Sequence, residues 1–230
     1  GLMLTLALPV MSQRTNEYLK PCDYKGKISR SGDNVLCWGE KVEPSFAESY
    51  EIQCWCNTKT NEFSLKLTVQ NQQDPHVLII DEDMAYQIRT LIDAAVFSAT
   101  NLPDKEWMKM ELEALKNGTG NISSVGLDGT TFRFYSRNYG AYCWSPHDGN
   151  NAALVNLFDV IYKAIGYKDI ERIKSKLDDI KSLTRKYASL LQDPYREYYL
   201  LRIDKKPNNW WWADESLRRS DGLCRSGIGR

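Results

Sequence analysis

The chain has 230 residues, of which 42% are hydrophobic and 26% are charged, proportions that are ordinary for a globular protein with a sizeable core. Thirty basic residues balance thirty acidic ones, so the net charge provides no attraction to nucleic acid or to an anionic membrane. Aromatic residues make up 11% of the chain, enough to supply both a core and a binding surface.

The chain starts with an apolar run over residues 2–13, and polar residues follow at once from Arg14. The run has the length of the apolar centre and cleavage region of a secretory signal, and it is shorter than the roughly 20 residues that a transmembrane helix needs. We therefore interpret residues 1–13 as the remnant of a signal peptide. The protein is expected to be secreted or periplasmic and not to span a membrane. A buried N-terminal strand or helix is the alternative.

Residues 14–47 are expected to form an irregular, cysteine-containing segment, because glycine and proline interrupt them repeatedly. The main domain is predicted to cover residues 48–204. It begins with a hairpin, because apolar residues alternate with polar ones over 50–56 and again over 63–69. The polar residues between these two strands form the hairpin loop.

Residues 76–80 form an apolar run that is typical of a short, fully buried strand. Asp81 is suited to cap a helix over 82–99, where apolar residues recur at helical spacing. Pro103 opens a further predicted helix over 104–116.

A second pair of strands is predicted over 131–136 and 141–144. An amphipathic helix over 151–165 and a long charged helix over 168–192 follow. The tyrosine- and leucine-rich residues 198–203 are interpreted as the last strand.

The fold class follows from these elements. Hairpins near residues 48–70 and 130–144 favour an antiparallel sheet, and the amphipathic helices need an apolar surface to cover. We therefore predict an α+β fold in which the helices pack on one face of the sheet. Residues 205–230, rich in tryptophan and then in glycine, arginine and serine, are expected to form a C-terminal tail.

The six cysteines are an even number, which is compatible with disulfides in an exported protein and also with buried free thiols. Cys22 and Cys37 flank a loop of glycine, serine and lysine, so we predict a bridge between them. Cys54 and Cys56 point to one face of a strand, where either could bond to Cys143. One C-x-C pair and two histidines do not match the two close ligand pairs of structural zinc, so we predict no metal and no cofactor.

The clearest catalytic candidates are Cys143, Ser145, His147 and Asp148, which lie within six residues. A nucleophile needs a base within hydrogen-bond reach and an acid that orients the base. Close neighbours in one loop seldom achieve this arrangement, and no G-x-S-x-G elbow is present. We therefore interpret the loop as structural and predict no catalytic residue.

Trp210, Trp211 and Trp212 are three adjacent indoles, which a helix or a strand points in different directions. At least one is therefore expected to be exposed or to be buried against a partner. The run is our candidate ligand-binding site, suited to a glycan or a peptide. The alternative is that the run fastens the C-terminus to the domain.

Together these features favour an exported, non-enzymatic binding or structural protein of the cell envelope, with an unidentified protein or glycan as its partner. Nucleic acid is not expected, because basic and aromatic residues do not interleave in the pattern of an RNA-binding sheet. Two alternatives stay open. One is an envelope hydrolase that uses His147 with Cys143 or Ser145, or a pair of carboxylates distant in sequence. The other is an inhibitor or immunity-type protein.

Overall fold

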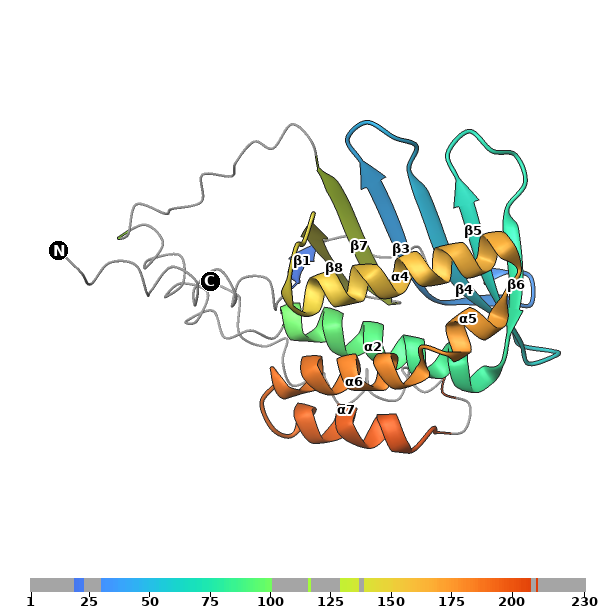
Figure 1. Cartoon of the computed structure of the whole chain (residues 1–230). Helices are drawn as coiled ribbons and strands as arrows, with labels where there is room; N and C mark the ends of the chain where they lie inside the picture. The colour runs from blue at the N-terminus through green and yellow to red at the C-terminus, as the bar shows by residue number, and fades with distance from the viewer. Residues whose placement is uncertain are drawn as a thin grey trace, which may run out of the picture.

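The computed structural model describes residues 19–22, 30–100, 116, 129–136, 139–207 and 210. These residues form one antiparallel sheet with helices packed on it, so the predicted α+β fold is confirmed. Figure 1 shows the helices as a layer in front of the sheet. The predicted signal remnant and most of the predicted tail lie outside the described residues.

The strands are β1 (Lys20–Cys22), β2 (Arg30–Ser31), β3 (Asn34–Pro44), β4 (Tyr50–Asn57), β5 (Glu62–Val69), β6 (His76–Ile80), β7 (Thr130–Ser136) and β8 (Tyr139–Trp144). Their order across the sheet is β1-β8-β7-β3-β4-β5-β6, and β2 pairs with the start of β3. Every pairing is antiparallel.

The helices are α2 (Glu82–Thr100), α4 (Gly149–Tyr167), α5 (Ile170–Lys174), α6 (Leu177–Ser189) and α7 (Tyr195–Asp204). α2 and α4 lie directly on the sheet, α2 mainly over β7 and β8 and α4 over β5 and β6. α6 packs on α2, and α7 packs on both (Figure 1). We call the opposite side of the sheet the open face. No described helix is long and apolar enough to cross a membrane.

The first predicted hairpin is confirmed in β4 and β5. Ile52, Cys54 and Cys56 alternate with less buried residues and lie fully buried under the helices, as the period of a strand requires. The predicted cap of α2 is confirmed as well. The main-chain N–H of Met84 donates a 2.8 Å hydrogen bond to Oδ1 of Asp81, which satisfies one of the free amides at the start of a helix.

The expectation of an irregular segment over residues 14–47 is wrong for Asn34–Pro44. These residues form β3, the longest described strand, which lies between β7 and β4 near the centre of the sheet. Gly39 lies inside this strand because the ring of Tyr135 passes over it and leaves no room for a side chain. A Cβ atom at Gly39 would lie 2.2 Å from the ring of Tyr135, which therefore requires glycine beneath it.

Two helix boundaries differ from the prediction. α4 continues past Gly166 to Tyr167. Lys168 caps it, since it adopts the left-handed conformation (φ 55°) and donates its N–H to carbonyls of the last turn. The predicted long helix 168–192 is divided into α5 and α6 by a turn at residues 175–176. Of the predicted helix 104–116, only the last residue is described, and it is helical.

Two predicted strands are corrected. Residues 198–203 belong to the helix α7, because Tyr199, Arg202 and Ile203 are buried at helical spacing rather than alternately. The strand at 76–80 exists, but it is not fully buried. It is the edge strand β6, so Val77 and Ile79 stand on the open face and are 45% and 50% exposed.

A buried ion network joins α2 to α7. The guanidinium of Arg202 lies 2.9 Å from Oδ2 of Asp93, and Nε of Arg89 lies 3.4 Å from the same oxygen. Burial raises the pKa of Asp93, but the charges of the two arginines outweigh it and hold that pKa below its usual value. The rings of three tyrosines surround the Arg202 guanidinium: Tyr86, Tyr198 and Tyr199.

Glu40 is a fully buried carboxyl group in β3, opposite the buried Ile52 of β4. Among the described residues, neither of its oxygens has a hydrogen-bond partner, and the neighbouring Trp38 Nε1 has none either. Burial, with a smaller contribution from the charge of Asp159, raises the pKa of Glu40 well above its usual value. The carboxyl group therefore favours its neutral form in the folded protein.

Replacing Glu40 with glutamine is expected to make stability less dependent on pH. Because the pKa is raised by folding, Glu40 contributes fully to stability below the pKa of the unfolded chain. That contribution is lost as the pH rises toward and through the raised pKa of the folded state, by about 1.4 kcal/mol per pH unit. Urea unfolding of both proteins between about pH 5 and about pH 7 measures this difference.

The control is Glu48→Gln in the exposed loop after β3, where the same chemical change is made in contact with water. This variant is expected to follow the wild type at every pH. If Glu40→Gln also follows the wild type, the Glu40 carboxyl is not held neutral by the fold.

Candidate functional site

The four residues predicted to form a structural loop lie in different environments. Cys143 is 7% exposed and lies on the buried side of β8, where burial, with a smaller effect of the Glu40 charge, raises the pKa of its thiol to about 12. Ser145 fastens the end of β8 to β7, because its Oγ accepts a 2.8 Å hydrogen bond from the N–H of Thr130. His147 and Asp148 are exposed, and Asp148 takes the N-cap position of α4. In this part of the described chain, no hydrogen bond joins the thiol of Cys143 to the imidazole of His147.

Neither of the two predicted disulfide bridges is present in this structure, in which none of the five described cysteines forms a disulfide. The sheet order explains why. Cys22 in β1 and Cys37 in β3 are separated by β8 and β7, which corresponds to about 14 Å at the usual spacing of strands. The same number of strands separates Cys143 from Cys54 and Cys56. A disulfide needs Cα atoms within about 7 Å.

Trp210 is buried, with 3% of its surface exposed, and contributes to the core. Its ring stacks on Phe63 at 5.3 Å between centroids and meets Tyr86 edge to face at 5.4 Å. Its indole N–H donates a 3.1 Å hydrogen bond to Oε1 of Glu82. The other two members of the predicted ligand-binding run, Trp211 and Trp212, lie outside the described residues.

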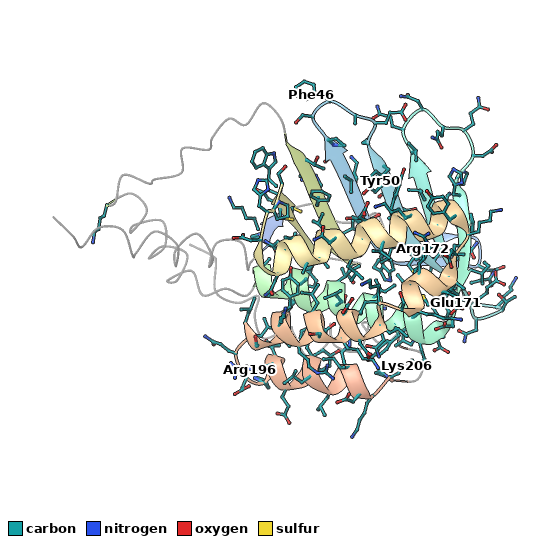
Figure 2. All side chains as sticks on the ribbon, viewed as in Figure 1. Phe46, Tyr50, Glu171, Arg172, Arg196 and Lys206 are labelled. Atoms are coloured by element: carbon teal, nitrogen blue, oxygen red, sulfur yellow. The ribbon has the colours of Figure 1, made fainter. Side chains whose placement is uncertain are left out.

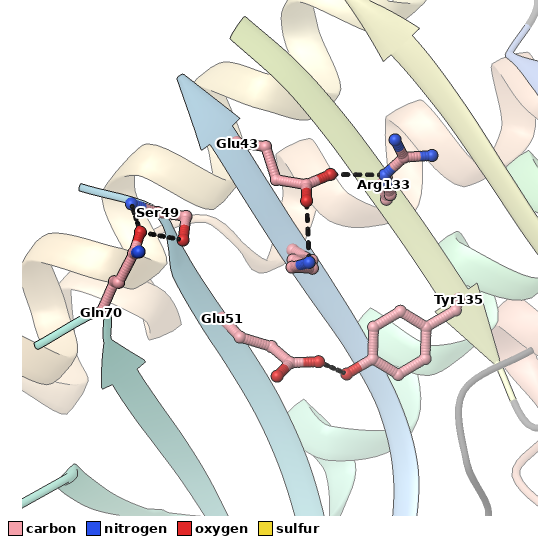
Figure 3. Close-up of polar contacts among 7 residues, drawn as sticks. Glu43, Ser49, Glu51, Gln70, Arg133 and Tyr135 are labelled. Atoms are coloured by element: carbon pink, nitrogen blue, oxygen red, sulfur yellow. Dashed lines mark hydrogen bonds and ion pairs between the residues drawn. The ribbon is translucent and has the colours of Figure 1, made fainter. Parts of the chain in front are cut away.

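The open face carries an ion-pair bridge across β3 and β7. Oε2 of Glu43 lies 2.6 Å from Nε of Arg133, and its Oε1 lies 2.7 Å from Nζ of Lys41 (Figure 3). The hydrogen bonds from Arg133 and then from Lys41 lower the pKa of Glu43 below its usual value. All three side chains are about one-third exposed, so the bridge is accessible to a partner.

A second row of hydrogen bonds runs beside this bridge. The Tyr135 hydroxyl donates to Oε1 of Glu51 at 2.5 Å, so the tyrosine ring crosses β3 above Gly39 (Figure 3). Nε2 of Gln53 donates to the same hydroxyl at 3.2 Å, and the indole N–H of Trp55 donates to Oε1 of Gln53 at 3.1 Å. The row therefore holds side chains of β7 and β4 in fixed positions over the intervening strand.

Aromatic rings lie around these polar groups. Trp55 and Tyr142 are partly exposed on the open face, and the guanidinium of Arg133 lies 5.9 Å from the centroid of the Tyr142 ring. Trp144, at the end of β8, is 43% exposed. Phe46 is 79% exposed in the loop after β3 and projects from the end of the sheet (Figure 2). Large rings beside fixed hydrogen-bonding groups are typical of surfaces that bind proteins or sugars.

Sequence reasoning did not identify this surface. The signal was present in part, because Glu51, Gln53 and Trp55 alternate with the buried residues of β4. Their partners lie in β7, which is joined to β4 by β3. Because β3 was not predicted from the sequence, the two sets of residues could not be brought together. Among the described residues, no group of three or more histidine, cysteine or acidic side chains is arranged to hold a metal ion.

Comparisons of the chain with protein-family models, with curated proteins and with solved structures found no match.

Proposed function

We propose that this chain is an exported, non-enzymatic binding protein of the cell envelope and that a protein or a glycan binds to the open face of its sheet. The observation that carries the proposal is the ordered set of polar side chains on that face, bonded to one another across three strands. Side chains that are already fixed lose little conformational entropy when a partner binds, which favours affinity.

The surrounding rings support the same proposal. Trp144, Trp55 and Tyr142 offer apolar surface next to hydrogen-bonding groups, a combination that suits both the flat faces of sugars and the side chains of a protein partner. The apolar N-terminal residues 2–13 support the export part of the proposal, because their length is that of a secretory signal.

Arg133→Ala is expected to weaken binding to the envelope partner by about 30-fold, the equivalent of about 2 kcal/mol for a central arginine of an interface. Its melting temperature should change little, because partly exposed ion pairs contribute about 1 kcal/mol or less. Immobilised wild type and variant are compared for capture from envelope and cytosolic extracts. The captured protein or glycan is identified by mass spectrometry and titrated as a purified component.

Arg185→Ala is the matched control, since Arg185 is exposed on α6, on the other side of the molecule. It is expected to bind like the wild type. The proposal fails if Arg133→Ala binds as tightly as Arg185→Ala, or if material is captured only from the cytosol.

A further inference from the structure

Three buried thiols lie together between the sheet and the helices. Cys37 comes from β3, and Cys54 and Cys56 come from β4, and none of the three has any exposed surface. The thiol of Cys37 interacts with that of Cys54, and it also donates a 3.8 Å hydrogen bond to the carbonyl oxygen of Val35. The charge of Cys37 also acts on Cys56, so this cysteine lies close to both partners.

A β-bulge brings Cys37 to this position. Leu36 pairs with Trp55, but the next paired residue of β3 is Trp38, which pairs with Cys54. Cys37 is therefore the extra residue of the bulge, and it faces Cys54 together with Trp38. Residues that face each other across antiparallel strands have Cα atoms about 4.5–5.5 Å apart. A disulfide accepts Cα separations of about 4.4–6.8 Å, so the usual spacing of facing residues is one that a disulfide can bridge.

We propose that Cys37 and Cys54 form a disulfide bond when the chain folds in the presence of a small-molecule disulfide. In this exchange the oxidant's S–S bond is broken and its two sulfurs leave as thiols. Cys37 and Cys54 together give up two protons and two electrons, and a new S–S bond joins β3 to β4. Cys56 stays reduced, because it lies opposite Val35, two pairs further along the two strands.

The bond must form before the core closes. Exchange requires a thiolate and access for the oxidant. Burial, and then the hydrogen bond with Cys37, raise the pKa of Cys54 well above its usual value in the folded state. The folded, reduced protein is therefore expected to resist oxidation, whereas the same protein takes up the bond during folding.

The test starts from full-length protein that has been reduced and unfolded. One sample is refolded with a mixture of oxidised and reduced glutathione, and a second is refolded with reductant alone and exposed to the same mixture afterwards. Only the first should lose the mass of two hydrogen atoms, and its peptide map without reductant should link Cys37 to Cys54. Its denaturation midpoint should then fall when the bond is reduced.

Two variants identify the partners. Cys56→Ser is expected to keep the loss of mass, and Cys54→Ser is expected to abolish it. If a serine variant does not fold, the peptide map of the wild type still decides the question. Six free thiols after oxidative refolding, or a link from Cys37 to Cys56 or Cys22, would refute the proposal. The outcome is independent of binding at the open face.

Discussion

Replacement of Asp93 by alanine is expected to lower the free energy of unfolding by about 3–5 kcal/mol, because two buried guanidinium groups then lose their counter-ion. Arg89 is 1% and Arg202 is 9% exposed, so water cannot replace the lost carboxylate. The unfolding should be measured in urea at neutral pH. The slope of the transition should stay unchanged, since the same surface is exposed on unfolding.

The control for this prediction is Asp159→Ala on α4. Oδ2 of Asp159 lies 2.6 Å from Nζ of Lys163, four residues later in the helix. Arg89 and Asp93 form an ion pair at the same spacing in α2. Both members of the control pair are about half exposed, and such pairs contribute about 1 kcal/mol or less. If both variants lower the free energy of unfolding by the same amount, burial of the Asp93 network does not increase the cost of losing the carboxylate.

Trp210→Ala is expected to cost about 3–5 kcal/mol, the usual result of removing a buried aromatic side chain. The indole fills the space between Phe63 of β5 and Tyr86 of α2, and it bonds to Glu82. The Arg89 guanidinium also loses the ring beside it, which lies 5.3 Å away. Thermal and urea unfolding of the purified variant measure the loss.

Trp144→Ala serves as the matched control, because it removes the same side chain from an exposed position on the open face. It is expected to destabilise the fold far less than Trp210→Ala. If the two losses are alike, Trp210 does not have the role in the core that its contacts indicate.

The elements that were predicted best from the sequence are those in which one side faces the core and the other does not, because their apolar residues then recur at a regular spacing. β4 and β5 alternate regularly because one side faces the core and the other side faces away from it. β3 was not predicted, because Gly39 and Pro44 were interpreted as interruptions of regular structure. Its charged residues Glu40, Lys41 and Glu43 are also unusual near the centre of a sheet. The charges are accommodated by the tertiary structure, through ion pairs at Lys41 and Glu43 and through the raised pKa of Glu40.

The error at α7 has a similar origin. The sequence Tyr-Tyr-Leu-Leu-Arg-Ile over 198–203 has the composition of a strand, and the local pattern cannot separate a short buried strand from a helix. In the structure Arg202 contacts Asp93 of α2, a residue far away in the sequence, so the local pattern does not contain this interaction. The open face was not predicted for the same reason. Its hydrogen bonds join strands that are distant in sequence, and their pairing cannot be inferred from local patterns.

The pairing of β3 with β7 has a consequence for how the chain folds. Glu43 of β3 and Arg133 of β7 are bonded diagonally across this pair although they are 90 residues apart in sequence. Bringing such distant segments together costs more loop-closure entropy than forming the short hairpin of β4 and β5, and folding rates fall as the average separation of contacting residues grows. During synthesis, β3 to β6 emerge first and can pair among themselves, while the edge of β3 stays unpaired until β7 has left the ribosome. During that interval the edge of β3 is available for pairing with other chains.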